Sequence, residues 1–178
     1  TFSDALTLAI CLNKGLTKKV LKYEKINNPD FFEIDDLKQL EKINNFPLFA
    51  KPIAEGTSKG VELCSLINNK TELENITKKL LEKFKQPVLV EEYLPGKEFT
   101  VGIVGTGLDA KAVGVLEINC QKGLYTFESK QDYRNLVKYN LAKEPYKTEC
   151  EDFALHIWRT LKCRDAGRVD IKYDKNNK

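Results

Sequence analysis

The chain has 178 residues and a mass of 20.3 kDa, enough for one domain with a core of its own or for two small ones. Its 29 basic residues nearly balance 26 acidic ones and its pI is about 8.5, which argues against the strongly basic surface of a nucleic-acid-binding protein. No apolar run approaches the roughly 20 residues that a membrane span needs, so we expect a cytoplasmic protein that binds neither nucleic acid nor membrane.

The first part of the chain has the apolar spacing of helices. A helix capped by Asp4 is predicted to begin at Ala5, and after Gly15 a second helix spans Leu16–Tyr23. A third is predicted over Ile34–Asn44, where leucine and isoleucine recur every three residues.

A hairpin and a helix are predicted next. Phe46–Ile53 is a compact apolar run typical of a buried strand, Ala54–Gly60 is a glycine-bearing loop, and Val61–Ile67 is a returning strand. Thr71–Phe84 is amphipathic and opens on a Thr-x-x-Glu capping box, which predicts a helix.

From Val88 onward the apolar period changes to two, as in strands. The strands of an antiparallel meander are predicted over Val88–Tyr93, Glu98–Val104 and Ala112–Ile118, with turns at 95–96 and 106–109. A helix is predicted over Asp152–Leu161 and a last strand over Gly167–Tyr173. This order of elements predicts an α+β fold with two lobes.

Five cysteines are far apart in the sequence and form no C-x-x-C pair: Cys11, Cys64, Cys120, Cys150 and Cys163. Neither a disulfide framework nor a zinc site is indicated, which favours a reducing compartment and cysteines that serve as small apolar core residues. The chain begins with Thr1 and ends on Lys-Asn-Asn-Lys after a predicted strand, so we expect a part of a longer protein.

Lys51-Pro52 and the segment Glu55-Gly56-Thr57-Ser58-Lys59-Gly60 lie between the two predicted strands of the hairpin. Two glycines and two hydroxyls allow a hairpin tip to place N–H and O–H donors on phosphate oxygens, and Lys51 adds a positive charge. The segment lacks the Walker spacing G-x-x-x-x-G-K-[ST], so these residues by themselves also fit an ordinary hairpin.

Pro87–Thr100 is the most informative segment. Its buried strand ends on Glu91-Glu92-Tyr93, turns at Pro95-Gly96 and continues with Glu98 on a new strand. Such an edge offers a purine a backbone donor and acceptor, an apolar wall, and a carboxylate for the ribose hydroxyls. The alternative is an amphipathic hairpin whose carboxylates face solvent.

Arg168 and Asp170 share one face of the last predicted strand, because side chains alternate along a strand. Facing a cleft, such a pair binds an anion and a divalent cation together. Facing solvent, it is a surface ion pair that contributes little.

In this order the patterns K-P-x-x-E-G-[ST]-S-x-G, V-E-E-Y-L-x-G-x-E-F-T-V and G-R-V-D resemble the D-alanine–D-alanine ligase branch of the ATP-grasp superfamily. Asn13-Lys14 and Lys18 fall where that family has a D-K-x-x-x-K segment. The resemblance implies an α+β ATP-grasp fold, with two antiparallel-sheet lobes and flanking helices, incomplete at both ends. Residues 1–45 would be leading helices and linker, 46–93 the small lobe with the phosphate-binding hairpin, and 94–178 the larger lobe, truncated before a second metal motif.

The resemblance also implies a role for single residues around ATP and Mg²⁺. The implied cofactor-binding residues are Lys14 and Lys51 on the phosphates, Glu55, Thr57 and Ser58 in the hairpin, Glu91 on the adenine amino group, Tyr93 and Leu94 at the ring, and Glu98 on the ribose. The implied catalytic residues are Lys130, in the loop Tyr125–Gln131, on the terminal phosphate, and Arg168 on the acyl phosphate and tetrahedral species, with Asp170 as a magnesium ligand.

The implied reaction is an ATP-dependent ligation in two steps. A carboxylate attacks the γ-phosphate of ATP, and an amine then displaces phosphate from the acyl phosphate, giving a dipeptide, ADP and phosphate. The protein supplies positioning and charge neutralisation. The implied substrates are small amino acids such as D-alanine, joined for cell-wall peptidoglycan precursors, and the implied full-length protein is a cytoplasmic homodimer.

Three departures from the family pattern keep alternatives open. Gln131 stands where the family usually has a tyrosine linked to the choice of second substrate, and Thr126 replaces an aspartate. The family's E-x-N metal strand should follow Asp170, whereas the string Glu117-Ile118-Asn119 precedes it and is assigned to the meander, with Glu117 outward. A related ligase for other amino acids or peptides, or a non-catalytic nucleotide-binding module, are therefore the alternatives, and we expect this chain alone to be inactive.

Overall fold

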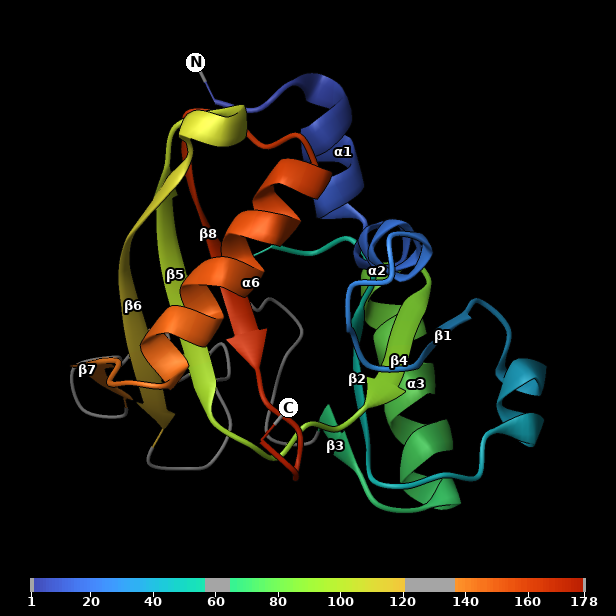
Figure 1. Cartoon of the computed structure of the whole chain (residues 1–178). Coiled ribbons are helices and arrows are strands. Elements are labelled where there is room, and N and C mark those ends of the chain that lie inside the picture. The colour runs from blue at the N-terminus through green and yellow to red at the C-terminus, as the bar shows by residue number, and fades with distance from the viewer. Residues whose placement is uncertain (1, 57–64, 121–136, 178) are drawn as a thin grey trace.

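The computed structural model describes residues 2–56, 65–120 and 137–177. Two four-stranded sheets stand side by side, one with the strand order β1-β4-β2-β3 and the other with the order β7-β6-β5-β8 (Figure 1). Neighbouring strands are antiparallel in both sheets. The predicted α+β fold of two antiparallel-sheet lobes with flanking helices is thus confirmed.

The smaller lobe contains one long helix and short strands. Its elements are β1 (Phe31–Ile34), the 3-10 helix η1 (Leu37–Lys42), β2 (Leu48–Pro52), β3 (Leu66–Ile67), α3 (Lys70–Phe84) and β4 (Val88–Glu92). Strand alternation places Leu48, Ala50, Val88 and Val90 on the face that packs against α3, where they form a buried core with Leu73. The opposite face therefore presents the intervening residues of β2 and β4.

The larger lobe is built in the same way around a second helix. Its elements are β5 (Glu98–Val104), the 3-10 helix η3 (Gly107–Asp109), β6 (Lys111–Cys120), β7 (Val137–Leu141), α6 (Tyr146–Thr160) and β8 (Ala166–Lys172). Phe99, Val101 and Ile103 of β5 are buried against Ala154 and Trp158 of α6. The alternate residues of β5 lie on the face away from α6.

Two short helices connect the lobes. Helix α1 (Ala5–Leu12) lies beside the C-terminal end of α6, while α2 (Lys14–Tyr23) lies over the smaller lobe (Figure 1). The hydroxyl of Thr7 on α1 donates to the Leu161 carbonyl at 3.0 Å, and the Lys14 amide at the start of α2 donates to the Ile53 carbonyl at 3.0 Å. Residues 7–14 therefore bridge the two lobes.

The segment between β4 and β5 is the second bridge. The Gly96 amide donates to the Tyr173 carbonyl at 2.9 Å, and the Tyr173 amide donates to the Lys97 carbonyl at 2.9 Å. A Cβ at Gly96 would lie 2.6 Å from the carbonyl oxygens of Tyr173 and Asp174, so only glycine allows this close approach. At the predicted Pro-Gly turn, two backbone segments therefore lie in close contact.

Several predicted elements differ from those observed. The third predicted helix, Ile34–Asn44, is wrong: Phe31–Ile34 pairs with β4 as a strand, and Asp36 caps a 3-10 helix that ends at Lys42. Helix α3 is capped by Asn69, which accepts from the Glu72 amide at 3.0 Å, and not by Thr71. The pairing of β1 with β4 and the capping of α3 by Asn69 thus determine where these elements begin, and the local sequence patterns do not.

In the larger lobe the observed elements extend the predicted ones. Helix α6 begins at Tyr146 and not at Asp152, and the 106–109 turn contains the 3-10 helix η3. Strand β7 was not predicted, and of the strand predicted over Val61–Ile67 only the last three residues lie within the described part of the chain. The division at residues 46 and 94 remains a prediction, although β1 from the first segment belongs to the smaller sheet.

Replacing Leu73 by Ala should reduce the free energy of unfolding by about 2–5 kcal/mol, because the side chain is fully buried between α3 and its sheet. Urea denaturation measures this change. The matched control is Asn75→Ala on the exposed side of the same helix, which we expect to change stability by about 0.5 kcal/mol or less. Equal effects of the two substitutions would contradict this packing.

Candidate nucleotide-binding site

Glu91 is the centre of the candidate site. It lies in β4, on the face away from α3, with a side chain only 9% exposed. The ammonium of Lys51 on β2 lies 2.5 Å from its Oε1, and that of Lys18 on α2 lies 2.8 Å from its Oε2. A buried carboxylate is stable only when it is paired in this way. Glu91 therefore joins α2, β2 and β4 at one point.

The three charges change one another's protonation. Burial pushes the pKa of Glu91 upward, but Lys51 and Lys18 together outweigh it and hold the pKa below its ordinary value. Burial lowers the pKa of Lys18, and Glu91 only partly opposes that effect. The carboxylate is thus ionised at neutral pH, at a place that the lysines make electropositive.

Lys14 is the third lysine of this cluster, at the start of α2. Its ammonium donates to the backbone carbonyls of Glu55, at 2.6 Å, and Ile53, at 3.4 Å. Burial, and secondly the charge of Lys51, lower its pKa from 10.5 to about 8. Lys14, Lys18 and Lys51 are called the lysine cluster below. With Glu91 they carry three positive charges and one negative charge, which suits a polyanion.

Aromatic rings surround the lysine cluster. The Lys51 ammonium lies 5.9 Å from the ring centre of Phe49, and that of Lys18 lies 5.5 Å from the ring centre of Phe31. Both phenylalanines are register partners of Glu91, one on each side of β4. Phe49 in turn stacks on Tyr93, with ring centres 6.5 Å apart. The site thus combines positive charge with flat apolar surfaces.

Glu55 follows β2 at the near end of the hairpin loop. Its carboxylate accepts from the side-chain amide of Gln86 at 2.8 Å, and Gln86 also accepts from the Ala54 amide at 2.8 Å. Because the Glu55 carbonyl holds Lys14, this network fixes the start of the loop beside the lysine cluster. The structure thus places Glu55 next to Lys14.

Glu98 begins β5, directly after the bridge that carries Tyr93 and Leu94. Its carboxylate is 21% exposed and lies 3.1 Å from the ammonium of Lys172, its register partner on β8. Both residues line a pocket of about 340 Å³, together with Gly96, Lys97 and Asn119. A pocket of this size, between a carboxylate and the interlobe bridge, can hold a small polar group such as a sugar.

Arg168 and Asp170 lie on the face of β8 away from α6, as the alternation predicts. Their side chains are 62% and 53% exposed, and the closest approach between the two charged groups is 3.9 Å. Asp170 Oδ1 accepts from the hydroxyl of Thr100 at 2.7 Å. The second oxygen, Oδ2, has only the distant guanidinium of Arg168 as its partner, and carboxylate oxygen is the ligand that Mg²⁺ prefers.

A complete metal site is not assembled by the described residues. Within residues 2–56, 65–120 and 137–177, no three acidic, histidine or cysteine side chains gather closely enough to hold an ion. Asp170 thus fits as one ligand among others. Glu117, which the sequence analysis separated from this role, lies in β6, is 22% exposed, and pairs with Lys97 at 3.2 Å.

Three predicted site residues lie outside the described part of the chain: Thr57, Ser58 and Lys130. The same holds for Thr126 and Gln131. Sequence reasoning noted Lys18 but did not place it in the site, and it missed Lys172. The four-residue spacing of Lys14 and Lys18 was a usable signal, because residues so spaced share a helix face. Lys172 could be found only from the pairing of β5 with β8.

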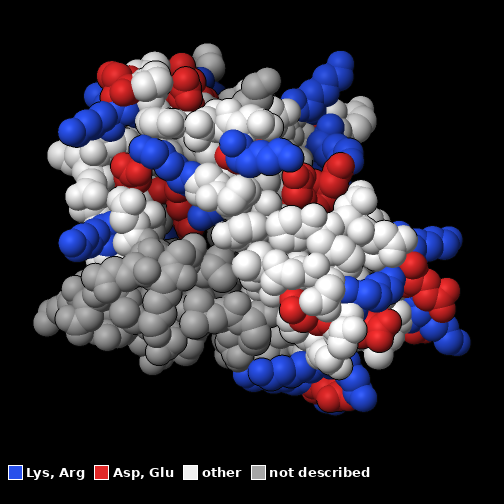
Figure 2. Space-filling view, turned by 90° about the horizontal axis from the view of Figure 1, so that it is seen from below, with Lys and Arg blue, Asp and Glu red and all other residues white. Residues whose placement is uncertain are grey.

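The surrounding surface is mixed in charge. Figure 2 shows acidic and basic side chains interspersed over the described part of one face. No helix among the described residues is long and apolar enough to cross a membrane.

Comparison with known proteins identifies the family. The family model described as "D-ala D-ala ligase C-terminus" matches residues 12–178. The chain belongs to this family. Among D-alanine–D-alanine ligases, that of Aquifex aeolicus is 32% identical over 182 residues, covering 100% of this chain and 59% of the relative. Ligase A of Bacillus cereus is 30% identical, covering 95% of this chain and 55% of the relative.

Solved structures of a D-Ala:D-Ser ligase and a D-alanine–D-alanine ligase contain the same fold. The VanG D-Ala:D-Ser ligase of Enterococcus faecalis superposes with a TM-score of 0.80 at 23% identity, covering 99% of this chain and 52% of that one. The D-alanine–D-alanine ligase of Bacillus anthracis, complexed with ATP, gives a TM-score of 0.72 at 25% identity, with coverages of 98% and 55%. The chain therefore spans about half the length of the relatives it matches.

The lowered pKa of Lys14 predicts a pH dependence of stability for this family member. The folded chain releases that proton near pH 8 and the unfolded chain near 10.5, so between these values the unfolded state binds more protons and stability rises with pH. We expect Lys14 to contribute a rise of about 1–2 kcal/mol between about pH 7.5 and 9.5.

Urea denaturation at the two pH values tests this expectation. Lys14→Gln should remove the rise that Lys14 contributes, whereas Lys22→Gln on the exposed face of the same helix should retain it. The same pH dependence in wild type and Lys14→Gln would contradict the burial argument.

Proposed function

We propose that this chain is the ATP-binding part of a carboxylate–amine ligase of the D-alanine–D-alanine ligase type. The enzyme would use ATP and Mg²⁺ to join small amino acids, such as D-alanine, through an acyl phosphate. The observation that carries the proposal is the lysine cluster around the buried Glu91, next to the interlobe bridge, in a chain of this family. The ATP complex of the Bacillus anthracis ligase, which is 25% identical, supports ATP as the ligand.

The charges explain why the ligand would be a nucleoside triphosphate. Lys14 and Lys51 have their ammonium groups partly buried, and Lys14 has backbone carbonyls as its hydrogen-bond partners. A triphosphate would bring the negative charge that this cluster lacks, and its binding would restore the pKa of Lys14 toward its ordinary value. Preorganised lysines of this kind also stabilise the charge that develops during phosphoryl transfer.

The adenosine would lie along Glu91, the bridge and Glu98. Glu91 would accept from the adenine amino group, which requires Lys18 or Lys51 to release one of its oxygens. Tyr93 and Leu94 would cover the ring, and Glu98, in its pocket with Lys172, would accept from the ribose hydroxyls. The hairpin residues Glu55, Thr57 and Ser58 would complete the phosphate side.

The remaining residues would act on the reacting groups. Asp170, held by Thr100, would be one ligand of Mg²⁺, which neutralises phosphate charge when bound. The exposed Arg168 would bind the acyl phosphate oxygens, and Lys130 the terminal phosphate. Each of these roles places a positive charge where negative charge develops, and none requires a protein nucleophile.

Glu91→Gln should reduce the preference of the chain for ATP over purine riboside triphosphate, which lacks only the 6-amino group. The two nucleotides share the triphosphate and the N1 acceptor, so changes in phosphate or N1 affinity cancel in the ratio, and the contact with the adenine amino group remains. A hydrogen bond to a charged acceptor contributes about 1.5–3 kcal/mol, so the unsubstituted chain should prefer ATP at least about tenfold. In Glu91→Gln the ratio of the two affinities should fall toward one. Calorimetric titration measures both affinities. Glu92→Gln, next along β4 on its exposed face, should keep the preference.

Asp170→Asn should reduce the gain in ATP affinity that Mg²⁺ produces, by about tenfold or ~1.4 kcal/mol, because it removes a charged metal ligand. Titrations with and without Mg²⁺ measure the gain. Asp152→Asn, on the exposed side of α6, is the control and should leave it unchanged. An undiminished gain in Asp170→Asn would remove Asp170 from the metal site.

The ligase reaction itself is tested on the full-length protein, because this chain spans only part of its relatives' length. ADP release from ATP on addition of D-alanine supports the D-alanine ligase. Release only with other amino acids indicates a related ligase, and no release with any of them indicates a nucleotide-binding module. ADP release by the 178-residue chain alone, with D-alanine, would contradict our expectation that it is inactive.

A further inference from the structure

Strands β5 and β8 carry facing residues along the side of the sheet that is turned away from α6. In order from the interlobe bridge, the register partners are Glu98 and Lys172, Thr100 and Asp170, and Gly102 and Arg168. The Lys172 ammonium lies 3.1 Å from Glu98 Oε2, and the Thr100 hydroxyl donates to Asp170 Oδ1 at 2.7 Å. Residues on one face of a strand are two positions, or about 7 Å, apart along the backbone. The Glu98–Lys172 pair is therefore one such step from Asp170.

The order of residues along β8 matches the order of groups in a nucleoside triphosphate. Under the proposed function, Asp170 would hold the metal ion at the phosphates, and Arg168 would lie at the group that is transferred. Lys172 follows Asp170 in the other direction, toward the bridge with Tyr93 and Leu94 where the adenosine would lie. The ammonium of Lys172 would therefore lie at the sugar and not at the reacting phosphate.

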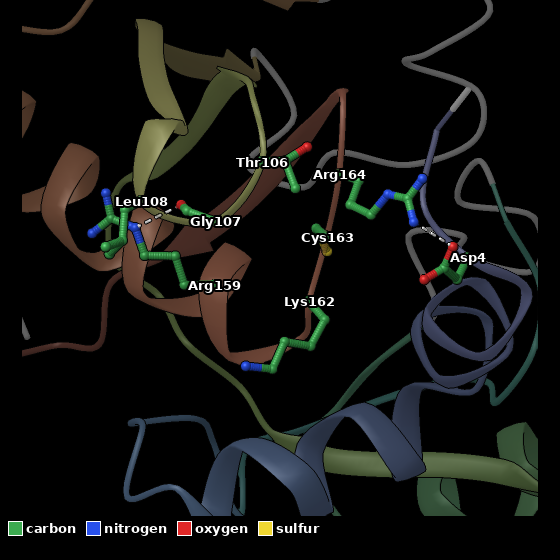
Figure 3. Close-up of a pocket in the computed structure, with 8 residues that line it drawn as sticks. All are labelled: Asp4, Thr106, Gly107, Leu108, Arg159, Lys162, Cys163 and Arg164. Atoms are coloured by element: carbon green, nitrogen blue, oxygen red, sulfur yellow. Dashed lines mark hydrogen bonds and ion pairs between the residues drawn. The ribbon is translucent and has the colours of Figure 1, made fainter.

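A pocket lies at each end of the β5–β8 pair. At the end where β5 leads into η3, the pocket contains Arg164, whose guanidinium turns toward Asp4 and pairs with it at 2.8 Å (Figure 3). This charge is thus neutralised within the chain, away from the interlobe bridge. At the other end, the pocket of about 340 Å³ is lined by Glu98, Lys172 and the bridge residue Gly96. A sugar next to the bridge would therefore meet a carboxylate and an ammonium side by side.

Glu98 and Lys172 together offer what a vicinal diol needs. Each ribose hydroxyl can donate one hydrogen bond and accept others, whereas a carboxylate only accepts and an ammonium only donates. The ammonium takes Glu98 Oε2 and has further N–H groups beyond that contact. A carboxylate by itself would also repel the nearby phosphates, and Lys172 neutralises its charge.

We infer that Lys172 is a specificity-determining residue of the proposed nucleotide site. Its ammonium donates to one ribose hydroxyl while Glu98 accepts from the other, so that the site selects ribonucleoside triphosphates over deoxynucleoside triphosphates. The inference rests on the proposed function, because it requires the nucleotide in this cleft. Lys172 acts on the binding of the sugar and not on phosphoryl transfer.

Calorimetric titration of the chain with ATP, 2′-deoxyATP and 3′-deoxyATP, each with Mg²⁺, tests the inference. Each deoxynucleotide loses a hydrogen bond to a charged group, so the unsubstituted chain should prefer ATP over both by at least about fivefold. Lys172→Met keeps the apolar stem and removes the ammonium. The preference over one deoxynucleotide should then fall toward one, while Glu98 maintains the preference over the other. Lost phosphate affinity cancels in these ratios.

Two further variants serve as comparisons. Lys172→Arg keeps a charged donor and should retain most of both preferences. Lys111→Met removes an exposed ammonium at the opposite end of the same sheet, where Lys111 is the register partner of Val104, and should change neither ratio. Far-ultraviolet circular dichroism confirms that each variant is folded.

The outcomes separate this inference from the proposed function. An equal loss of affinity for all three nucleotides in Lys172→Met would indicate a structural role or a phosphate contact, and would overturn the inference. Unchanged ratios would overturn it too, and a fall of both ratios would contradict the division of the hydroxyls between the two residues. A chain that binds ATP without preferring it over either deoxynucleotide overturns the inference alone. A chain that binds none of the three contradicts the proposed function as well.

Discussion

The ion pairs of Glu91 with Lys18 and Lys51 are the interaction on which the arrangement of the smaller lobe depends. Removing a carboxylate from water costs several kcal/mol unless its partners are close and well oriented. Lys18 comes from α2 and Lys51 from β2, so the carboxylate on β4 sets where the helix lies on the sheet. Gly15 allows α2 to pass close to β1: a Cβ there would lie 2.1 Å from the Glu33 carboxylate, which would have to move aside. The ion pairs of Glu91 therefore set the position of α2.

The same constraint makes the site electropositive. One carboxylate satisfies two lysines, while the third, Lys14, is held by backbone carbonyls at the start of the hairpin loop. These contacts therefore stabilise the lobe, and they leave an excess of positive charge beside the aromatic rings and the interlobe bridge. A site of this kind costs stability when it is empty, which is common where proteins bind charged ligands. A negatively charged ligand would supply the charge that balances the lysine cluster.

Much of the fold was predictable because strand periodicity is a local property. Alternation placed Arg168 and Asp170 on one face, and the bounds of β4 and β5 were predicted to within a residue. The helix predicted over Ile34–Asn44 was wrong because a four-residue strand is too short to show its period, and because β1 forms only by pairing with β4. Glu98 and Lys172 meet across 74 residues, and only the strand register brings them together.

The two bridges between the lobes explain how distant parts of the chain affect the same site. One bridge carries Tyr93 and Leu94 and is held by the close approach of Gly96 to Tyr173. The other runs from α1, on the larger lobe, to Lys14, on the smaller lobe. One residue, Asn13, separates α1 from α2, so the contacts of α1 with the larger lobe and those of Lys14 with the smaller lobe restrict each other's position.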